Sequence, residues 1–157
     1  MNEQDERRGR MCYACGERNE RGFHMSFSRE GERTVCTYTP CQYQQGFPGR
    51  LHGGVVATMI DEAMGWAVYH ARAWGATARL NVRYRKPVPL DGTLRIEAWV
   101  VRDRHRLMEL RAEVRDASGE VLAEGEGTFM KLDGRTGSEL SELARKAGRS
   151  DAPEVVT

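Results

Sequence analysis

One apolar segment constrains the fold of this chain more than any other feature. Residues 51–75 read LHGGVVATMIDEAMGWAVYHARAWG, which has the length of a helix and contains no proline. With Arg72 in its last turns, we predict that this helix ends at Gly75. Further along the chain the apolar period changes from helical to two, because apolar and polar side chains alternate. This alternation predicts four strands, at residues 78–85, 94–100, 108–114 and 121–129.

Two shorter strands precede the helix. They are predicted at residues 23–28 (FHMSFS) and 34–39 (TVCTYT), joined by a turn around Gly31. The connections between the four later strands are short, so neighbouring strands are expected to pair antiparallel. The apolar face of such a sheet must be covered, and only one long helix is available to cover it. The sequence therefore predicts an α+β fold: two strands, a helix and four strands, with a curled antiparallel β-sheet wrapped around one long central helix.

The two ends of the chain differ from this core. Residues 1–11 are rich in charge and are predicted to be a flexible N-terminal arm, whereas residues 12–132 form the single domain expected of a 157-residue chain. Residues 133–157 form a tail with one short helix. Its predicted capping box, apolar stripe and stop are Thr136 with Glu139, then Leu140, Leu143, Ala144 and Ala147, then Gly148.

Composition and charge exclude several classes of protein. The chain has 24 basic and 23 acidic side chains, and a net charge of +1 provides no global attraction to nucleic acid. Its first ten residues lack the apolar stretch of a signal peptide, and no uncharged stretch approaches the roughly 20 residues that cross a bilayer. We therefore expect a cytoplasmic protein with neither nucleic acid nor a membrane as its partner.

Two adjacent carboxylates interrupt the apolar helix. Asp61 and Glu62 have no cation three or four residues away, so neither has a partner on the helix itself. A carboxylate buried there would be desolvated, which raises its pKa and makes it a candidate base or nucleophile. In the alternative interpretation, one of the pair meets solvent, a partner subunit or an arginine of a strand.

The helix begins with His52-Gly53-Gly54. Two glycines let the backbone approach a ligand closely, and their free N–H groups, with the helix dipole behind them, suit an oxyanion. At a rise of 1.5 Å per residue, Gly53 lies about 12 Å from Asp61, too far for both to touch one reacting carbonyl. If they cooperate, Asp61 acts on a substrate held by Gly53 of another subunit. Such cooperation predicts an obligate two-fold homodimer with two sites at its interface.

The segment LHGGVVATMIDEAMGWA resembles the helix signature of hotdog-fold acyl-CoA thioesterases of the PaaI-like (phenylacetate-degradation) type. In that family HGG is followed by an aspartate nine residues after the histidine, which is the spacing of Asp61 from His52. The resemblance covers about residues 12–131, with the CYACG start, the QGFPG loop and a strand of the form N-x-x-Y-x-x-P, here Asn81, Tyr84 and Pro87. It implies a hotdog fold and hydrolysis of acyl-CoA thioesters, with no cofactor besides the coenzyme A of the substrate.

The resemblance also implies roles for individual residues. Asp61 would be the general base or nucleophile, the Gly53 N–H of the facing subunit would polarise the thioester carbonyl, and His52 would shape that loop. Thr77, four residues before the strand asparagine, would help to position the water. Because Thr77 has the phase of the polar strand residues, it reaches the site only if the strand start is bent near Gly75.

Further residues are candidates for binding the substrate. Gly46 stands where some relatives carry an asparagine six residues before the histidine. A basic run on one strand edge contains Arg83 and Arg85, and is either its solvated face or a contact for the phosphates of coenzyme A. Glu62 is the alternative to Asp61 as the working carboxylate. The complete set of substrate-binding candidates is Gln45, Gly46, Gly54, Arg83 and Arg85.

The cysteines give a weaker signal. Cys12 and Cys15 have the spacing of half a zinc site, and a second half could come from His24, Cys36 or Cys41. None of these three gives a regular second pair of ligands. We therefore predict no metal and interpret the cysteines as buried or free thiols.

The leading hypothesis is an acyl-CoA thioesterase that acts as a homodimer or as a dimer of dimers. A non-catalytic hotdog module that binds acyl-CoA is the alternative, since fold alone does not decide function. A hotdog dehydratase fits poorly, because the chain has no His/Asp pair on a strand-to-helix loop. Turnover that depends on Asp61 separates the enzyme from the binding module.

Overall fold

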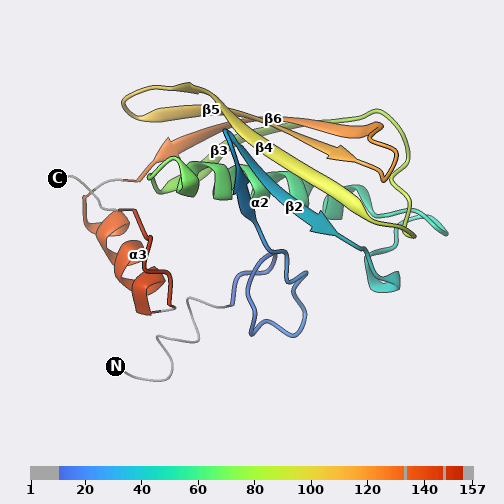
Figure 1. Cartoon of the computed structure of the whole chain (residues 1–157), viewed down its shortest axis with the longest axis horizontal. Helices are drawn as coiled ribbons and strands as arrows, with labels where there is room; N and C mark the ends of the chain where they lie inside the picture. Colours follow the sequence, from blue (N-terminus) through green and yellow to red (C-terminus); the bar gives the residue numbers. More distant parts are fainter. Residues whose placement is uncertain (1–10, 133, 147, 154–157) are drawn as a thin grey trace.

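The computed structural model describes residues 11–132, 134–146 and 148–153. Within them, six antiparallel strands form one sheet in the order β1-β2-β4-β5-β6-β3, and the long helix α2 (Gly53–His70) lies along one face of that sheet (Figure 1). The α+β hotdog architecture expected from the sequence is therefore confirmed. The strands are β1 (Ser28–Glu30), β2 (Arg33–Tyr38), β3 (Gly75–Tyr84), β4 (Leu94–Asp103), β5 (Leu107–Arg115) and β6 (Val121–Lys131).

Helix α2 is the centre of the core. Met59, Ile60 and Met64 are completely buried between α2 and the sheet. Glycines in β6 let the helix approach this closely, because a Cβ on Gly125 would overlap Ile60 Cγ2 and a Cβ on Gly127 would lie 2.5 Å from Met64 Sδ. The alternating glycines of this strand therefore set the distance between helix and sheet.

The pairing of β3 differs from the expectation that neighbouring strands pair. β3 pairs with β6, and β4 pairs with β2 and β5, so the connection from β3 to β4 crosses the end of the sheet. That connection contains Pro87 and Pro89, which have no N–H to donate to a hairpin. It pairs instead with the residues that precede α2, through Leu51 N–H to Val88 C=O at 2.9 Å and a bridge between Arg50 and Pro89.

The strand predicted at residues 23–28 was wrong except at its last residue, since β1 is only Ser28–Glu30. The apolar alternation that suggested it is real, because Phe23 and Met25 are buried and His24 is exposed. The N–H groups of Phe23 and Met25 donate to the C=O groups of Tyr13 and Ala14 rather than to a strand. His24, between them, has a φ of 54°, outside the extended region.

The predicted end of α2 was also wrong, because the helix ends at His70 and Gly75 begins β3. Arg72 has a φ of 63°, and its N–H donates to Tyr69 C=O while the Ala73 N–H donates to Val68 C=O. This is a Schellman motif with an arginine where glycine is usual, so the usual sequence signal for the helix end is missing.

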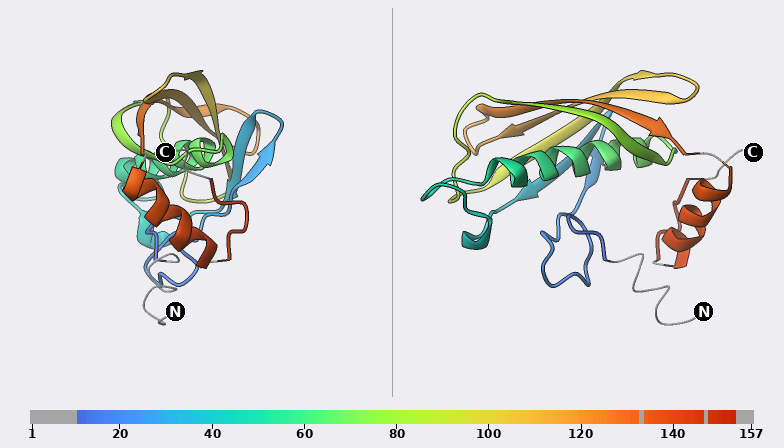
Figure 2. Two further views of the ribbon diagram at one scale, coloured as in Figure 1. Left: turned by 90° about the vertical axis from the view of Figure 1, so that its left-hand side faces the viewer. Right: turned by 180° about the vertical axis from the view of Figure 1, so that it is seen from behind.

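The C-terminal helix α3 (Gly134–Lys146) and the loop around residues 11–22 lie on the other side of α2 from the main sheet (Figures 1 and 2). The predicted capping box is wrong, because α3 begins at Gly134 and Thr136 lies inside the helix rather than before it. The predicted stop at Gly148 is confirmed: its φ is 86°, and it donates to Arg145 C=O. Ala147 and residues 1–10 of the predicted arm lie outside the described residues.

No helix in the described part of the chain combines the length and the apolar character needed to cross a bilayer.

Candidate active site

Asp61 projects from α2 toward the start of the edge strand β3. The hydroxyl of Thr77 donates a hydrogen bond to Asp61 Oδ1 at 2.7 Å. A β-bulge between Thr77 and Arg79 makes this contact geometrically feasible. Thr77 pairs with Phe129, whose side chain is in the core, and the extra residue of the bulge turns Thr77 away from the polar face of the strand. Thr77 thus reaches the site through a bulge within β3, whereas the expectation was a bend of the strand near Gly75.

The start of α2 is held by two side chains. His52 is the N-cap, and its Nδ1 accepts the Gly54 N–H at 2.9 Å. The hydroxyl of Tyr84 donates to Gly53 C=O at 2.6 Å. These two bonds fix both ends of the peptide group between Gly53 and Gly54.

The two glycine N–H groups therefore differ, although the sequence suggested that both are free. The Gly54 N–H is bonded to His52, and a Cβ on Gly54 would lie only 3.1 Å from that ring nitrogen. Glycine at position 54 thus makes room for the cap. The Gly53 N–H has no acceptor in the described part of the chain, and it remains the available donor at the positive end of the helix dipole.

The two adjacent carboxylates lie in different surroundings. Asp61 is half-buried and faces β3, whereas Glu62 faces the N-terminal loop. Glu62 accepts a bond from the Trp66 indole N–H at 3.1 Å, and burial raises the pKa of Glu62 to about 7. Neither carboxylate forms an ion pair with any residue that the structure describes. Among the described residues, therefore, no strand arginine pairs with Asp61 or Glu62, as the alternative interpretation had suggested.

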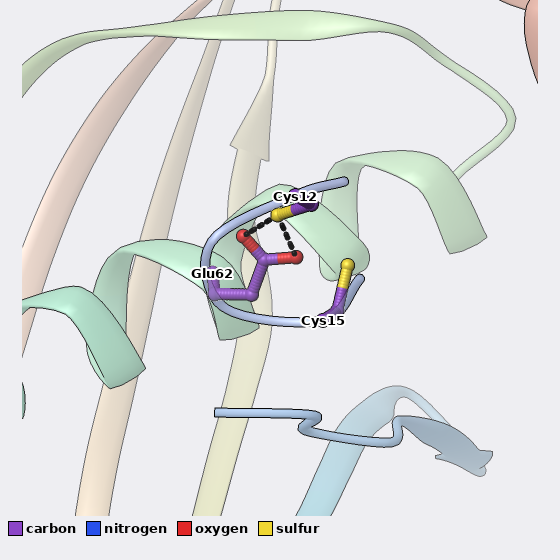
Figure 3. Close-up of side chains that lie close together, drawn as sticks. All are labelled: Cys12, Cys15 and Glu62. Atoms are coloured by element: carbon purple, nitrogen blue, oxygen red, sulfur yellow. Dashed lines mark hydrogen bonds between the residues drawn. The ribbon is translucent and has the colours of Figure 1, made fainter. Parts of the chain in front are cut away.

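A cysteine pair lies on the Glu62 side of α2 (Figure 3). Cys12 Sγ is 3.6 and 3.7 Å from the two Glu62 oxygens. Interaction between the two neighbouring thiols lowers the pKa of Cys12 to about 5 and raises the pKa of Cys15. The sequence signal for this contact was the carboxylate without a partner on the apolar helix. The residues that the sequence suggested as further zinc ligands, His24, Cys36 and Cys41, are not part of this contact.

Gln45 and Gly46 lie in the loop beside the helix start. The Gln45 side-chain oxygen accepts the Gly49 N–H at 2.9 Å, which fixes the turn of the loop. A Cβ on Gly46 would lie 3.0 Å from His52 Cα, tighter than ordinary packing allows. An asparagine at position 46 would therefore push against the capping residue His52.

The two arginines proposed for phosphate contact lie on the opposite face of the sheet. Leu80 and Val82 pack against the core, so Arg83 points away from α2. Arg85 forms an ion pair with Glu124 at 2.7 Å. Both arginines line a cavity of about 460 Å³ on this outer face. Within one protomer the structure therefore does not bring them together with Asp61.

Known proteins share this sequence pattern and fold. Residues 48–123 match the Thioesterase superfamily. Acyl-coenzyme A thioesterase THEM4 of Bos taurus is 38% identical over 107 residues, covering 68% of this chain and 44% of that protein. The Xenopus laevis protein of the same name is 32% identical over 109 residues, covering 69% of this chain and 49% of that protein. This chain thus spans about half the length of the curated relatives it matches.

Solved structures give the same result for the fold. The crystal structure of a thioesterase superfamily protein superposes with a TM-score of 0.74 at 29% identity, covering 77% of this chain and 63% of that one. The PaaI protein of the E. coli phenylacetic acid degradation operon has a TM-score of 0.66 at 16% identity, with 71% and 82% covered. Residues 48–123 therefore belong to a domain of the thioesterase superfamily, and the chain has the hotdog fold that these solved structures share.

Proposed function

We propose that this protein hydrolyses acyl-CoA thioesters to a free acid and coenzyme A, at sites shared between two subunits. The observation that carries the proposal is the bond from Thr77 to Asp61 on the same helix that presents the free N–H of Gly53. A carboxylate with a positioned hydroxyl can activate water, and a free N–H at a helix start can stabilise an oxyanion. The THEM4 relatives, named acyl-coenzyme A thioesterases, support the substrate class.

In the proposed reaction Asp61 removes a proton from a water molecule that Thr77 helps to position. The water oxygen attacks the thioester carbon, and the carbonyl oxygen becomes an oxyanion bonded to the Gly53 N–H. The intermediate then collapses with cleavage of the C–S bond, and the coenzyme A thiolate takes the proton from Asp61. If Asp61 is instead the nucleophile, its carboxylate attacks the thioester carbon and expels the coenzyme A thiolate, which leaves a mixed anhydride. Water then hydrolyses the anhydride to the free acid and the Asp61 carboxylate, and the proton released is taken by the thiolate. Either route uses only water and side chains and needs no cofactor.

The edge strand supports a dimer. β3 lies at one edge of the sheet and leaves backbone N–H and C=O groups unpaired on its outer side. Asp61 contacts Thr77 at one end of β3, and Gly53 contacts Tyr84 at the other. Antiparallel pairing of this edge with a second copy would bring the Thr77 end of one protomer beside the Tyr84 end of its partner. We propose that each site combines Asp61 of one subunit with Gly53 of the other, in a homodimer that can pair into a tetramer.

The first test is thiol release from short, medium, long and aryl acyl-CoAs. We expect the wild type to turn over at least one of them, and Asp61→Asn to lose at least about 100-fold in kcat. Glu62→Gln is the matched control, because Glu62 faces the other side of α2. If Glu62→Gln loses more activity than Asp61→Asn, the assignment of the carboxylate is refuted. If neither wild type nor variant releases thiol while acyl-CoA binds, the chain is a binding module.

The second test isolates the Gly53 N–H. Gly53→Pro removes this donor at the first position of a helix, where proline is well tolerated, and His52 already has the extended conformation (φ −64°, ψ 135°) that suits a residue before proline. Gly53→Ala keeps the N–H, and its Cβ would be 3.5 Å from the Tyr84 ring, an ordinary contact. We expect a loss of about 100-fold or more in kcat for the proline variant and little change for the alanine variant.

Mixing the two inactive proteins tests the shared site. A hybrid dimer of Gly53→Pro and Asp61→Asn subunits contains one site with both groups intact and one with both changed. Random exchange of subunits should therefore restore about a quarter of the wild-type activity. If the mixture stays as inactive as its components although hybrid dimers are present, Asp61 and Gly53 act within one subunit and the shared site is refuted.

A further inference from the structure

A three-residue cluster lies outside the proposed reaction site. Cys12 and Cys15 come from the loop before β1, and Glu62 comes from α2, 50 residues beyond Cys12. The sulfur of each cysteine and a carboxylate oxygen of Glu62 all lie within 4.8 Å of one another. Figure 3 shows the two sulfurs and the carboxylate pointing toward one another. Nothing in the proposed hydrolysis uses this arrangement.

The spacing of these atoms fits a tetrahedral metal ion. Zinc lies about 2.3 Å from a thiolate sulfur and about 2.1 Å from a carboxylate oxygen, so in a tetrahedron the sulfur and the oxygen are about 3.6 Å apart. Cys12 Sγ is 3.6 and 3.7 Å from the Glu62 oxygens. A metal ion can therefore enter between these groups with only small side-chain movements.

Neighbouring groups hold the cluster in place. The Trp66 indole N–H orients the Glu62 carboxylate through a bond of 3.1 Å. The loop that carries both cysteines is closed by the Gly16 N–H to Cys12 C=O bond at 2.9 Å. Bonds of this kind are the outer-shell contacts that orient metal ligands.

Charge also favours a divalent cation. Two thiolates and one carboxylate carry three negative charges, which zinc would reduce to one. The Arg149 guanidinium, 3.9 Å from the Cys15 sulfur and stacked on Trp66, would neutralise the charge that remains. A disulfide between the cysteines would instead leave the carboxylate of Glu62 without a cation in a desolvated position.

We propose that Cys12, Cys15 and Glu62 bind one zinc-class divalent cation, with water as the fourth ligand. Thiolate ligands favour zinc over magnesium or calcium. In the described part of the chain no fourth side chain of a ligand type joins the cluster, so the remaining position falls to solvent. The ion would fasten the N-terminal loop to α2, on a different side of the helix from Asp61.

The test uses the full-length reduced protein. After removal of metal with a chelator and reloading with zinc chloride, elemental analysis should find about one zinc per chain. Reloading with cobalt should give a thiolate-to-cobalt charge-transfer band and the visible bands of a tetrahedral site. In competition with a chromophoric chelator, Glu62→Gln and Cys15→Ser should each bind zinc at least about 100-fold more weakly than the wild type.

Cys41→Ser is the matched control, because Cys41 is exposed and outside the cluster. It should bind zinc like the wild type. The proposal is overturned if the reduced wild type takes up no stoichiometric zinc, if Glu62→Gln binds as tightly as the wild type, or if Cys41→Ser weakens binding as much as Cys15→Ser. Should Cys15→Ser fail to fold by circular dichroism, the stoichiometry and the cobalt spectrum of the wild type still decide.

Discussion

The hydroxyl of Tyr84 is expected to act on the reaction without touching the substrate. It donates to Gly53 C=O, while His52 accepts the N–H at the other end of the same peptide group. Glycine has more backbone freedom than other residues, so Gly53 needs such a restraint to keep its own N–H in one direction. Tyr84→Phe removes the restraint and keeps the ring. Tyr84 is thus a positioning residue for the Gly53 donor.

The size of the effect follows from the bond and its exposure. The bond is 2.6 Å long, but Tyr84 is 50% exposed, so water can replace part of it. A neutral hydrogen bond contributes about 0.5–1.5 kcal/mol, and about 1 kcal/mol corresponds to a five-fold change in rate. We expect kcat to fall about five-fold in Tyr84→Phe, with KM almost unchanged because no contact with the substrate is removed.

Steady-state thiol release from acyl-CoA measures both constants. Tyr69→Phe is the control, because it loses a comparable hydroxyl bond, 2.8 Å to Asp151, near the other end of α2. It should lower the free energy of unfolding and leave kcat unchanged. An unchanged kcat in Tyr84→Phe would refute the positioning role, and a raised KM with an unchanged kcat would mean that the hydroxyl binds the substrate itself.

Two further predictions concern stability. Gly125→Ala should lower the free energy of unfolding by about 1–3 kcal/mol, because the new Cβ would overlap Ile60 Cγ2. Combined with Ile60→Ala it should cost less than the sum of the two single changes, and strict additivity in urea denaturation would contradict this contact. Burial lowers the pKa of His70, which bonds to Thr34 at 2.7 Å. The unfolded state therefore binds this proton at higher pH than the folded state, and stability should decrease as pH falls through the ordinary pKa of histidine, about 6.5. Denaturation at several pH values should show that the free energy of unfolding decreases less steeply with falling pH in His70→Gln than in the wild type. Equal slopes for the two proteins would contradict the role given to His70.

The period of the apolar residues was enough to predict α2 and the strands β2 to β6, but not β1, the end of α2 or how the strands pair. Alternation identifies which residues face the core, and it located β3 to β6 to within a few residues. It carries no information on which strand lies beside which. The pairing of β3 with β6 depends on the long connection bonding to residues 50–51, a tertiary contact between segments far apart in the sequence.

The candidate site was predictable in its chemistry more than in its geometry. The helix pattern singled out His52, Gly53 and Asp61, but the bulge that brings Thr77 to Asp61 has no signal in the residues around it. The Tyr84 bond and the cysteine contact with Glu62 were missed for a similar reason. Each joins two elements across the fold, and a local pattern does not report such contacts.

The bulge in β3 has a consequence for how this scaffold can change. Thr77 and Tyr84 are seven positions apart, about 23 Å along an extended strand, and each is attached to a different part of α2. Losing or gaining one residue between them would turn one of the two side chains to the opposite face of the sheet. The strand therefore keeps a fixed spacing between the Thr77 contact with Asp61 and the Tyr84 contact with Gly53. Insertions and deletions that adapt the protein to other acyl groups are therefore expected in the surrounding loops, where no such spacing has to be kept.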